Sequence, residues 1–217
     1  MSRIFIYSDS LSWGLIPGTR QRLPFDQRWP GVLEDTLCGS GQSVRVLEDC
    51  LNGRRTVWED PFKPGRNGQA GLAQRIESQS PLDLVILMLG TNDFQYSQPF
   101  VEAWTAAQGI AALAQTVRQA PIEPGLPVPA ILIVCPPRIR APRGPLATKF
   151  AGAEERSAGL GEAYQAIAAE LNCHYFDAET ATSVSPVDGI HLDVAEHRKL
   201  GFAMAGVVQS ILTSESH

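Results

Sequence analysis

Short runs of apolar residues recur along the chain and alternate with longer segments in which apolar residues return every three or four positions. Short apolar runs are typical of buried β-strands, and the longer spacing is typical of amphipathic helices. The run at residues 84–89 has no polar position, which indicates a central strand covered on both faces. The pattern predicts strands near residues 3–7, 44–48, 83–89, 130–135 and 174–177.

Helices are expected between these strands and after the last one, near residues 29–38, 67–79, 99–119, 149–171 and 194–212. The final helix should pack on the sheet, because it carries an apolar stripe at helical spacing: Leu200, Met204, Val207, Val208 and Ile211. Pro99 is expected in the first turn of its helix, and the stripe that follows predicts that Phe100 and Trp104 belong to the core. Strands that alternate with helices predict βαβ units, a parallel sheet and an α/β fold.

The composition fits one folded domain. A chain of 217 residues can bury a substantial core and still form a single domain, residues 1–217. Its 44% hydrophobic and 19% charged residues are close to the average of globular proteins. The net charge of −5 argues against nucleic acid or an anionic membrane as the main partner, because polyanions attract basic surfaces. Small molecules are therefore the expected ligands.

Nothing in the sequence indicates export, a membrane span or a metal centre. The first residues run directly into the first predicted strand, which leaves no room for a signal peptide and predicts a cytoplasmic protein. The longest apolar run is far too short to cross a bilayer. The four cysteines show no CxxC spacing, so we expect reduced thiols in the core, with neither disulfides nor zinc ligands.

Residues with chemical potential follow four of the predicted strands. Ser10 follows the first strand, Gly53 the second, Asn92 the third, and Asp188 and His191 follow the fifth. Because the carboxyl ends of parallel strands lie at one edge of the sheet, these groups can converge on one crevice. A hydroxyl, amide donors, an imidazole and a carboxylate are the parts of a serine hydrolase.

The spacing of these residues suggests a role for each. A serine hydroxyl is a weak nucleophile until a base takes its proton, and His191 can be that base for Ser10. Asp188 precedes the histidine by three residues, so a tight turn, which Gly189 permits, would bring its carboxylate onto one ring nitrogen. Taken alone, each signal has an ordinary reading: a serine or aspartate after a strand is commonly a turn or cap residue.

Two further groups could stabilise an oxyanion. The Asn92 side chain carries an NH₂ group, a neutral donor suited to a charge that forms only in the transition state. The amide of Gly53 can approach an oxyanion closely because glycine has no side chain. Both positions could equally be plain turns, but the order of all these residues, each after a strand, is much rarer than any one of them.

With these residues the chain resembles the SGNH (GDSL) family of serine hydrolases over nearly its whole length. The matching motifs are Asp9-Ser10-Leu11, Gly53, Gly90-Thr91-Asn92-Asp93 and the Asp188-x-x-His191 pair. Within the family the chain is similar to small bacterial arylesterases and acyltransferases. One position departs from the pattern: Ser8 stands where the family usually has glycine, and we expect it to restrict the turn or to add a hydroxyl near the site without removing a catalytic group.

The resemblance implies a flavodoxin-like fold, a three-layer α/β/α sandwich with a five-stranded parallel sheet. It also implies a serine esterase that cleaves short-chain aryl or alkyl esters through an acyl-enzyme, with acyl transfer to alcohols as a second outcome and no cofactor or metal. The implied nucleophile is Ser10, with Asp188 and His191 as its partners. The implied oxyanion hole comprises Ser10, Gly53 and Asn92.

Substrate contacts are harder to assign from the sequence. Trp13 and Phe94 could line the acyl site and favour short chains, or pack under the loops. Arg54 and Arg55, beside the second strand, could meet an anionic substrate, although such arginines are more often solvated. The irregular stretches 15–28 and 136–148 follow strands and should overhang the site; such an edge also allows self-association into a homo-oligomer.

Two other classes of protein remain open at this point. A metal-dependent phosphoesterase would use hard ligands from the same positions, namely Asp9, Asn92, Asp93, Asp188 and His191. Loss of activity in EDTA would indicate this class. A non-catalytic binding module on the same fold is the other alternative, and it would leave Ser10 unreactive towards a fluorophosphonate.

Overall fold

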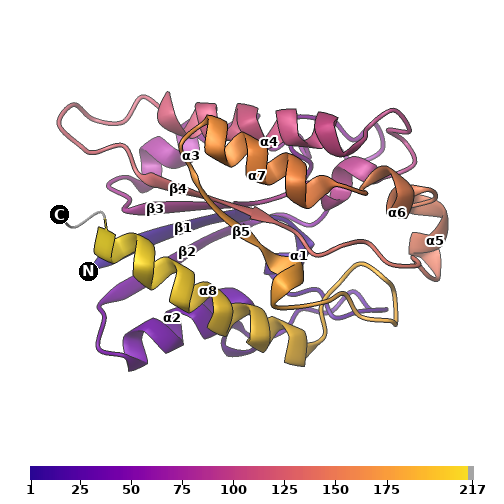
Figure 1. The fold of residues 1–217 in the computed structure, drawn as a ribbon, viewed down its shortest axis with the longest axis horizontal. Helices are drawn as coiled ribbons and strands as arrows, with labels where there is room; N and C mark the ends of the chain where they lie inside the picture. The colour runs from indigo at the N-terminus through magenta and orange to yellow at the C-terminus, as the bar shows by residue number, and fades with distance from the viewer. Residues whose placement is uncertain (215–217) are drawn as a thin grey trace.

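The computed structural model describes residues 1–214 and is built around a five-stranded parallel sheet (Figure 1). The strands lie in the order β2-β1-β3-β4-β5, and every neighbouring pair is parallel. All five predicted strands are confirmed with small differences at their ends: β1 (Ser2–Ser8), β2 (Val44–Cys50), β3 (Leu84–Met88), β4 (Ala130–Cys135) and β5 (His174–Asp177).

Helices cover both faces of the sheet and complete a three-layer α/β/α sandwich, as expected (Figure 1). The lower layer in Figure 1 contains α2 (Trp29–Gly39) and α8 (Val194–Ser214), which pack against each other. The upper layer contains α3 (Leu72–Gln79), α4 (Ala103–Arg118) and α7 (Leu160–Glu170). The predicted fold class is therefore confirmed.

The central strand β3 supplies side chains to both layers. Val85 and Leu87 belong to the core beneath α3, α4 and α7, whereas Leu84, Ile86 and Met88 belong to the core beneath α2 and α8. Successive side chains of a strand point to opposite faces, so a strand with no polar position is buried on both sides. This confirms the central place that the sequence predicts for this strand.

Two predicted helices differ from those observed. The helix expected near residues 67–79 starts only at Leu72. The continuous helix expected at 149–171 is wrong, because Gly152 and Gly159 adopt φ values of 69° and 81°, which a right-handed helix cannot include. That part of the chain instead forms α5 (Pro145–Lys149), α6 (Ala153–Arg156) and α7.

The prediction that Phe100 and Trp104 belong to the core is also wrong. Helix α4 begins after Glu102, whose backbone is extended with φ −116° and ψ 173°, so Pro99 and Phe100 precede the helix. Phe100 is 61% exposed and Trp104 is 69% exposed. The face of α4 that packs on the sheet is formed by its smaller residues and its aliphatic residues: Ala106, Ala107, Ile110, Ala111, Leu113, Ala114 and Val117.

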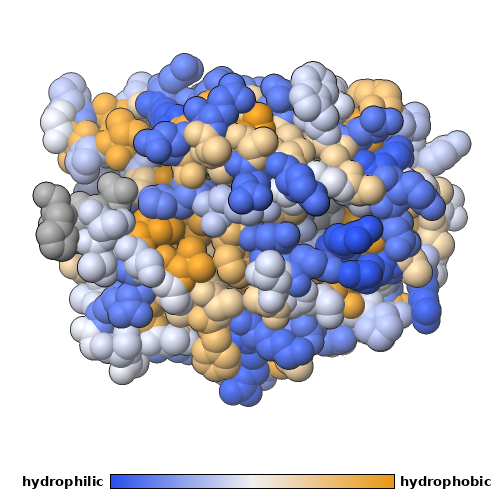
Figure 2. All heavy atoms as spheres, viewed as in Figure 1, coloured by the Kyte–Doolittle hydropathy of each residue, from blue (hydrophilic) through white to orange (hydrophobic). Residues whose placement is uncertain are grey.

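The edge at which the strands end lies on the right in Figure 1, where α1 (Ser10–Trp13), α5 and α6 gather, and the chain termini lie on the left. In the same view Figure 2 shows strongly hydrophilic residues on the right of this face and apolar residues in the band between α7 and α8. Within residues 1–214, no helix combines the length and the apolar character that a bilayer span requires.

Candidate active site

Ser10 is the first residue of α1, immediately beyond the end of β1. Between the two elements Asp9 caps the helix, since its Oδ1 atom accepts a hydrogen bond of 2.9 Å from the Leu11 N–H. The sequence thus turns abruptly from strand to helix and holds the serine hydroxyl at the carboxyl edge. Ser10 is 7% exposed, which leaves its hydroxyl within reach of a small substrate.

The structure brings Ser10, His191 and Asp188 into one hydrogen-bonded series. His191 Nε2 lies 3.1 Å from Ser10 Oγ, and His191 Nδ1 lies 2.7 Å from Asp188 Oδ2. The carboxylate fixes the proton on Nδ1 and leaves Nε2 free to accept the serine proton. These are the positions that a nucleophile, a general base and an orienting carboxylate require.

The turn that carries the aspartate and the histidine is held by its own backbone. Asp188 Oδ1 accepts hydrogen bonds from the N–H groups of Ile190 and His191, at 3.0 and 2.9 Å. Gly189 has φ 76°, and a Cβ atom there would lie 2.2 Å from the carbonyl oxygen of Arg140. Only glycine fits, which explains the spacing seen in the sequence.

Asp188 remains charged throughout the physiological range. Burial alone would raise the pKa of this carboxyl, but hydrogen bonds from the side chain and backbone of His191, and from the Ile190 N–H, lower it to about 2. The Gly18 N–H adds a longer contact of 3.3 Å to Oδ2. A permanently ionised partner stabilises the imidazolium that forms when the histidine takes a proton.

Asn92 lies within the 3₁₀ turn η2 (Thr91–Phe94), which follows β3. Its Nδ2 atom donates to Asp9 Oδ2 at 2.8 Å, and its Oδ1 atom accepts from Gln95 Nε2 at 2.8 Å. These two contacts fix which end of the amide carries the NH₂ group. One N–H bonds to Asp9, and the second N–H of the group is available for an oxyanion.

Gly90 is required at the start of this turn. It has φ 124°, and a Cβ atom would lie 2.3 Å from the hydroxyl oxygen of Tyr164. That hydroxyl donates a 2.9 Å hydrogen bond to the carbonyl oxygen of Leu89 and so ties α7 to the end of β3. The close packing of the tyrosine therefore positions the turn that carries Asn92.

Two buried carboxyl groups flank the asparagine. Burial raises the pKa of Asp9 to about 6, against the hydrogen bond from the Leu11 N–H. Burial also raises the pKa of Asp93 to about 7, against hydrogen bonds from the hydroxyl and the N–H of Thr56. Both shifts follow from the cost of a charge in a region without solvent.

Gly53 follows β2 and adopts φ 82°, and the space where a Cβ atom would point is open. Within residues 1–214 its N–H meets no acceptor at hydrogen-bonding distance. The next residue, Arg54, anchors this loop, because its guanidinium donates to the carbonyl oxygen of Ser8 at 2.9 Å and lies 3.9 Å from the centre of the Tyr7 ring. An unengaged N–H beside the end of β1 suits an oxyanion donor.

The expectation that Arg54 and Arg55 are solvated is wrong. They are 2% and 0% exposed, and both make internal contacts. Arg55 Nη2 donates to Gln95 Oε1 at 2.9 Å and lies 3.5 Å from the Asp60 carboxylate. A buried guanidinium needs such partners, since an unpaired charge is costly away from water.

Gln95 is therefore a site residue that the sequence reasoning missed, and Arg55, which the sequence suggested as a contact for an anionic substrate or as a solvated residue, instead lies buried behind Gln95. They form a second row behind Asn92: Arg55 holds the Gln95 amide, which in turn holds the Asn92 amide. The spacing of three residues between Asn92 and Gln95 in a tight turn could have indicated the inner contact. No local pattern could have indicated the contact between Arg55 and Gln95, because the arginine comes from a different loop.

Ser8, the departure from the family glycine, faces away from the reacting groups. Its hydroxyl donates to the carbonyl oxygen of Met88 at 2.7 Å and accepts from the Ser12 hydroxyl at 2.6 Å. The Trp29 ring N–H donates in turn to Ser12 Oγ at 3.0 Å. The added hydroxyl thus joins β1, β3, α1 and α2 beneath the nucleophile and removes no catalytic group.

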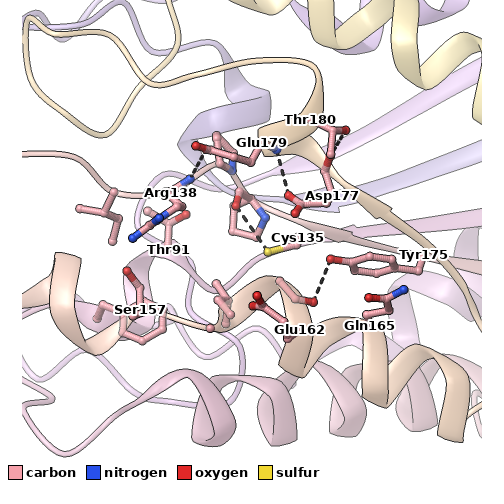
Figure 3. A pocket seen from close by; sticks show the side chains of 18 residues that line it. Thr91, Cys135, Arg138, Ser157, Glu162, Gln165, Tyr175, Asp177, Glu179 and Thr180 are labelled. Atoms are coloured by element: carbon pink, nitrogen blue, oxygen red, sulfur yellow. Dashed lines mark hydrogen bonds between the residues drawn. The ribbon is translucent and has the colours of Figure 1, made fainter.

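A cavity of about 600 Å³ opens beside the oxyanion turn, at the ends of β4 and β5 (Figure 3). Thr91 and Phe94 form part of its wall, together with Tyr175 and Asp177 from β5. The Thr91 hydroxyl is buried and has no hydrogen-bond partner within residues 1–214. The residues expected to carry the chemistry are not among those that line this cavity: Ser10, Gly53, Asn92, Asp188 and His191.

The two aromatic residues expected at the acyl site lie apart. Phe94 is fully buried in the core beneath α4 and α7 and borders the cavity. Trp13 is the last residue of α1, and the Arg22 guanidinium lies 4.9 Å from its ring centre. It borders a groove formed mainly by residues of β2 and α3. The structure therefore does not bring these two side chains together.

The ligand set of the alternative metal site is engaged in other contacts. Asp9 bonds to Asn92, Asp93 bonds to Thr56, and Asp188 bonds to the histidine. Within residues 1–214, no group of three or more histidine, cysteine, aspartate and glutamate side chains is arranged to hold a metal ion. The arrangement of the donors favours the serine chemistry.

The sandwich fold, with a serine, a histidine and an aspartate joined at its carboxyl edge, defines the class of serine ester hydrolases. Residues 9–199 match the model of the GDSL-like lipase/acylhydrolase family. The chain belongs to this family, and the resemblance found in the sequence is confirmed.

Solved structures and a curated relative agree with this assignment. An aryl esterase from M. smegmatis, in its inhibitor-bound form, superposes with a TM-score of 0.92 at 34% identity, over 97% of this chain and 100% of that chain. Est24, a carbohydrate acetylesterase from Sinorhizobium meliloti, gives a TM-score of 0.91 at 32% identity, over 97% and 100% of the two chains. An arylesterase of Vibrio mimicus is 33% identical over 91 residues, which are 42% of this chain and 38% of that relative.

Proposed function

We propose that this protein hydrolyses short-chain carboxylic esters, aryl or alkyl, through an acyl-enzyme on Ser10. The observation that carries the proposal is the series Ser10 Oγ, His191 Nε2, His191 Nδ1 and Asp188 Oδ2, with contacts of 3.1 and 2.7 Å. Membership of the lipase/acylhydrolase family and the likeness to an aryl esterase support the same reaction.

The first half of the reaction forms the acyl-enzyme. His191 Nε2 takes the proton of the Ser10 hydroxyl while the oxygen attacks the ester carbonyl, and the carbonyl electrons move onto the oxyanion. As the tetrahedral intermediate collapses, the bond to the alcohol breaks and the imidazolium returns the proton to the leaving oxygen. Asp188 stays ionised throughout and stabilises the imidazolium.

The second half releases the acid. Water gives a proton to His191 and attacks the acyl carbonyl, and collapse returns the proton to Ser10 Oγ. An alcohol that takes the place of water gives a new ester, so acyl transfer uses the same groups. In both halves the oxyanion accepts hydrogen bonds from the N–H of Ser10, the N–H of Gly53 and the Asn92 amide.

We propose small acyl groups such as acetyl, with Phe94 and Trp13 limiting the acyl and leaving-group sides respectively. Phe94 is the last residue of η2, the turn that carries Asn92, and is fully buried in the core, which supports a short acyl site. The name of the carbohydrate acetylesterase specifies an acetyl group, which supports a small acyl group here. The name of the aryl esterase specifies only the alcohol part of its substrates.

The proposal includes a single hydrolase domain over residues 1–217 that acts on small molecules in the cytoplasm without a bound cofactor. The family match spans most of the chain, which supports one domain. Cys38, Cys50, Cys135 and Cys173 are free thiols, which suits a reducing compartment.

Covalent labelling tests the nucleophile directly. A fluorophosphonate should add one phosphonyl group to the protein, located by peptide mass analysis at Ser10, and abolish hydrolysis of p-nitrophenyl acetate. The Ser10→Ala variant should neither be labelled nor turn over the ester. Ser183→Ala, an exposed serine outside the site, is the matched control and should behave as the unmodified protein. Undiminished hydrolysis by Ser10→Ala would refute the proposal.

A further inference from the structure

The cavity at the ends of β4 and β5 is not used by the proposed reaction. Its volume of about 600 Å³ suits a small molecule, and it is bounded by η2, by residues 136–139 after β4, by the end of β5 and by the start of α7. None of Ser10, Asn92 and His191 lines it. A ligand in this cavity would therefore contact a different set of side chains from those expected to cleave the ester.

One end of the cavity gathers hydrogen-bond acceptors, in the centre and on the right of Figure 3. Tyr175 and Asp177 reach it from β5, and Glu162 and Gln165 reach it from α7. The two helix residues are three positions apart and so lie on the same face of α7. We refer to these four residues as the acidic end of the cavity.

Asp177 has one carboxylate oxygen to offer at this end. Its Oδ1 atom accepts a 2.9 Å hydrogen bond from the Glu179 N–H, whereas its Oδ2 atom accepts none within residues 1–214. A Cβ atom at Gly161 would lie 3.1 Å from Oδ2, so the glycine leaves space beside this oxygen. A ligand that donates a hydrogen bond can use that space.

The negative charge of the acidic end is not neutralised by the protein. Glu179 also borders the cavity, but it pairs with the Arg140 guanidinium and accepts the Arg138 N–H at 2.9 Å. Within residues 1–214, Glu162 and Asp177 form no ion pair. Burial raises the pKa of Asp177, the Glu179 N–H opposes this shift, and the charges of Glu179 and Glu162 add to it. A bound cation would relieve this repulsion.

Thr91 borders the cavity from η2. Its side chain is 4% exposed, and its hydroxyl has no hydrogen-bond partner within residues 1–214. A buried hydroxyl without a partner is costly, so this part of the wall favours a ligand with a polar group. The exposed Arg138 lies near Thr91 in Figure 3, away from Tyr175 and Gln165. The cation of the cavity wall is thus separate from its acidic end.

We propose that this cavity binds a small primary amine, with its ammonium group at Asp177 and Glu162 and an uncharged polar group towards Thr91. An ammonium group has three donors, and its hydrogen bonds to carboxylates are strengthened by charge. The Tyr175 ring adds an aromatic face that attracts a cation. The inference goes beyond the esterase function, because it assigns a ligand to a second site.

Three four-carbon probes that differ at one end test the charge of the ligand. They are 4-amino-1-butanol, which is cationic at neutral pH, 1,4-butanediol, which is neutral, and 4-hydroxybutanoate, which is anionic. Isothermal titration calorimetry should give a Kd below about 1 mM for the amine and binding weaker by at least about 10-fold for the other two. Equally tight binding of the diol would overturn the inference, because the carboxylates would then not recognise the ligand.

A pair of variants tests the place of binding. Glu162→Gln/Asp177→Asn removes both charges and keeps an oxygen for the Glu179 N–H, and it should bind the amine about 10- to 50-fold more weakly. The matched control, Glu77→Gln/Glu123→Gln, removes the same charge from exposed carboxylates outside the cavity and should keep its Kd within about twofold. No loss in the first variant, or an equal loss in both, would overturn the inference.

A substitution without a change of charge keeps the inference testable if the first variant does not fold. Ala158 is exposed and lines the cavity, so Ala158→Phe should fill part of it and weaken amine binding by at least about 10-fold. Ala169→Phe places the same ring on an exposed position of α7 outside the cavity and should leave the Kd unchanged. Unchanged binding by Ala158→Phe would contradict the proposed site.

The esterase proposal succeeds or fails separately. Protein phosphonylated at Ser10 should bind the amine with an unchanged Kd, since Ser10 does not line the cavity. Loss of binding on phosphonylation would place the amine in the catalytic cleft and overturn the inference. Failure of the fluorophosphonate to label Ser10 would refute the esterase proposal instead, and the titrations of the unmodified protein and its variants would still decide the inference.

Discussion

The two halves of the active site are built in opposite ways. On the histidine side, Asp188 and His191 lie in one short turn, and backbone N–H groups of the same turn hold the carboxylate. On the oxyanion side, Asn92 is held by Asp9 from the end of β1 and by Gln95, and the glutamine is held in turn by an arginine from another loop. One half is thus a local structure, and the other exists only when distant segments assemble.

The two halves also differ in the pKa values of their carboxyl groups. Although burial would raise it, the pKa of Asp188 is lowered to about 2 by the groups of its own turn, so this half is charged at rest. Burial raises the pKa of Asp9 to about 6 and that of Asp93 to about 7. Both shifts show that this region is poorly solvated. The proposed donors there, two backbone N–H groups and the Asn92 amide, carry no charge of their own and favour a negative charge only when it forms in the transition state.

The largest effect is expected from the local half. His191→Ala should lower kcat for p-nitrophenyl acetate by up to about 10⁶-fold, because within residues 1–214 no other base contacts the Ser10 hydroxyl. Asp188→Asn should cost about 10⁴-fold, since the ring would lose the partner that fixes its tautomer. Steady-state kinetics, with circular dichroism to verify folding, measures both. Retention of more than a tenth of the activity by His191→Ala would mean that another residue is the base.

The oxyanion half should contribute less to the rate. Asn92→Ala removes a side-chain donor and should lower kcat by about 10²–10³-fold with little change in KM, because the lost hydrogen bond exists only in the transition state. Fluorophosphonate labelling should persist at a reduced rate, since Ser10 and His191 remain in contact. A loss confined to KM would instead place the asparagine in ground-state binding.

The same contrast decides what could be predicted from the sequence. The strands were predictable because apolar runs such as residues 84–89 report burial directly, and the spacing of Asp188 and His191 reports a turn. The two exposed aromatics, Phe100 and Trp104, were not, because the apolar stripe leaves open where α4 begins and thus which residues face the core.

Non-local contacts were the other part that remained hidden. The burial of Arg55 depends on the approach of Gln95 and Asp60, which are distant in sequence and carry no shared pattern. The role of the Ser8 hydroxyl likewise depends on its packing against Met88 and Ser12. Sequence reasoning therefore recovered the half of the site that its own turn defines more fully than the half that assembly defines.

The buried carboxyls predict opposite pH dependences of stability for the two halves. The pKa of Asp93 rises from 3.8 to about 7 on folding, so its favourable contribution is complete below pH 3.8 and is lost as the pH rises towards 7. Between pH 4.5 and 7, this carboxyl should therefore lower the free energy of unfolding by about 3 kcal/mol. Urea unfolding at the two pH values should show that the Asp93→Asn variant does not have this part of the loss. Asp9, whose pKa is raised from 3.8 to about 6, lowers the stability in the same direction as the pH rises towards 6. The Asp93→Asn variant keeps this contribution of Asp9.

Asp188→Asn is the matched control, because the native pKa of this carboxyl is lowered to about 2. Its contribution is present above pH 3.8 and is lost only as the pH falls towards 2, so the variant should leave the slope between pH 4.5 and 7 unchanged. Identical slopes for Asp93→Asn and the unmodified protein would show that Asp93 is ionised in the folded state at low pH.

The smallest effect is expected from the outer row of the oxyanion half. Gln95→Leu removes the donor that fixes the Asn92 amide, at 2.8 Å, and should lower kcat by about 10-fold while KM stays within twofold. Gln98→Leu is the matched control: its side-chain amide donates a 3.3 Å hydrogen bond to the Glu59 carbonyl, and its bond from Arg156 is accepted by the backbone carbonyl, which the substitution retains. Its kinetics should not change.

A structural role for Gln95 makes a different prediction from a positioning role. If Gln95 only supports the buried Arg55, its loss would lower the melting temperature and leave kcat of the folded enzyme unchanged. If it positions Asn92, affinity for a boronic acid that mimics the tetrahedral intermediate should fall in proportion to kcat, whereas affinity for the acetate product should stay constant. Combining Gln95→Leu with Asn92→Ala separates the two, because a residue that acts only through the asparagine has no further effect on kcat once the asparagine is gone.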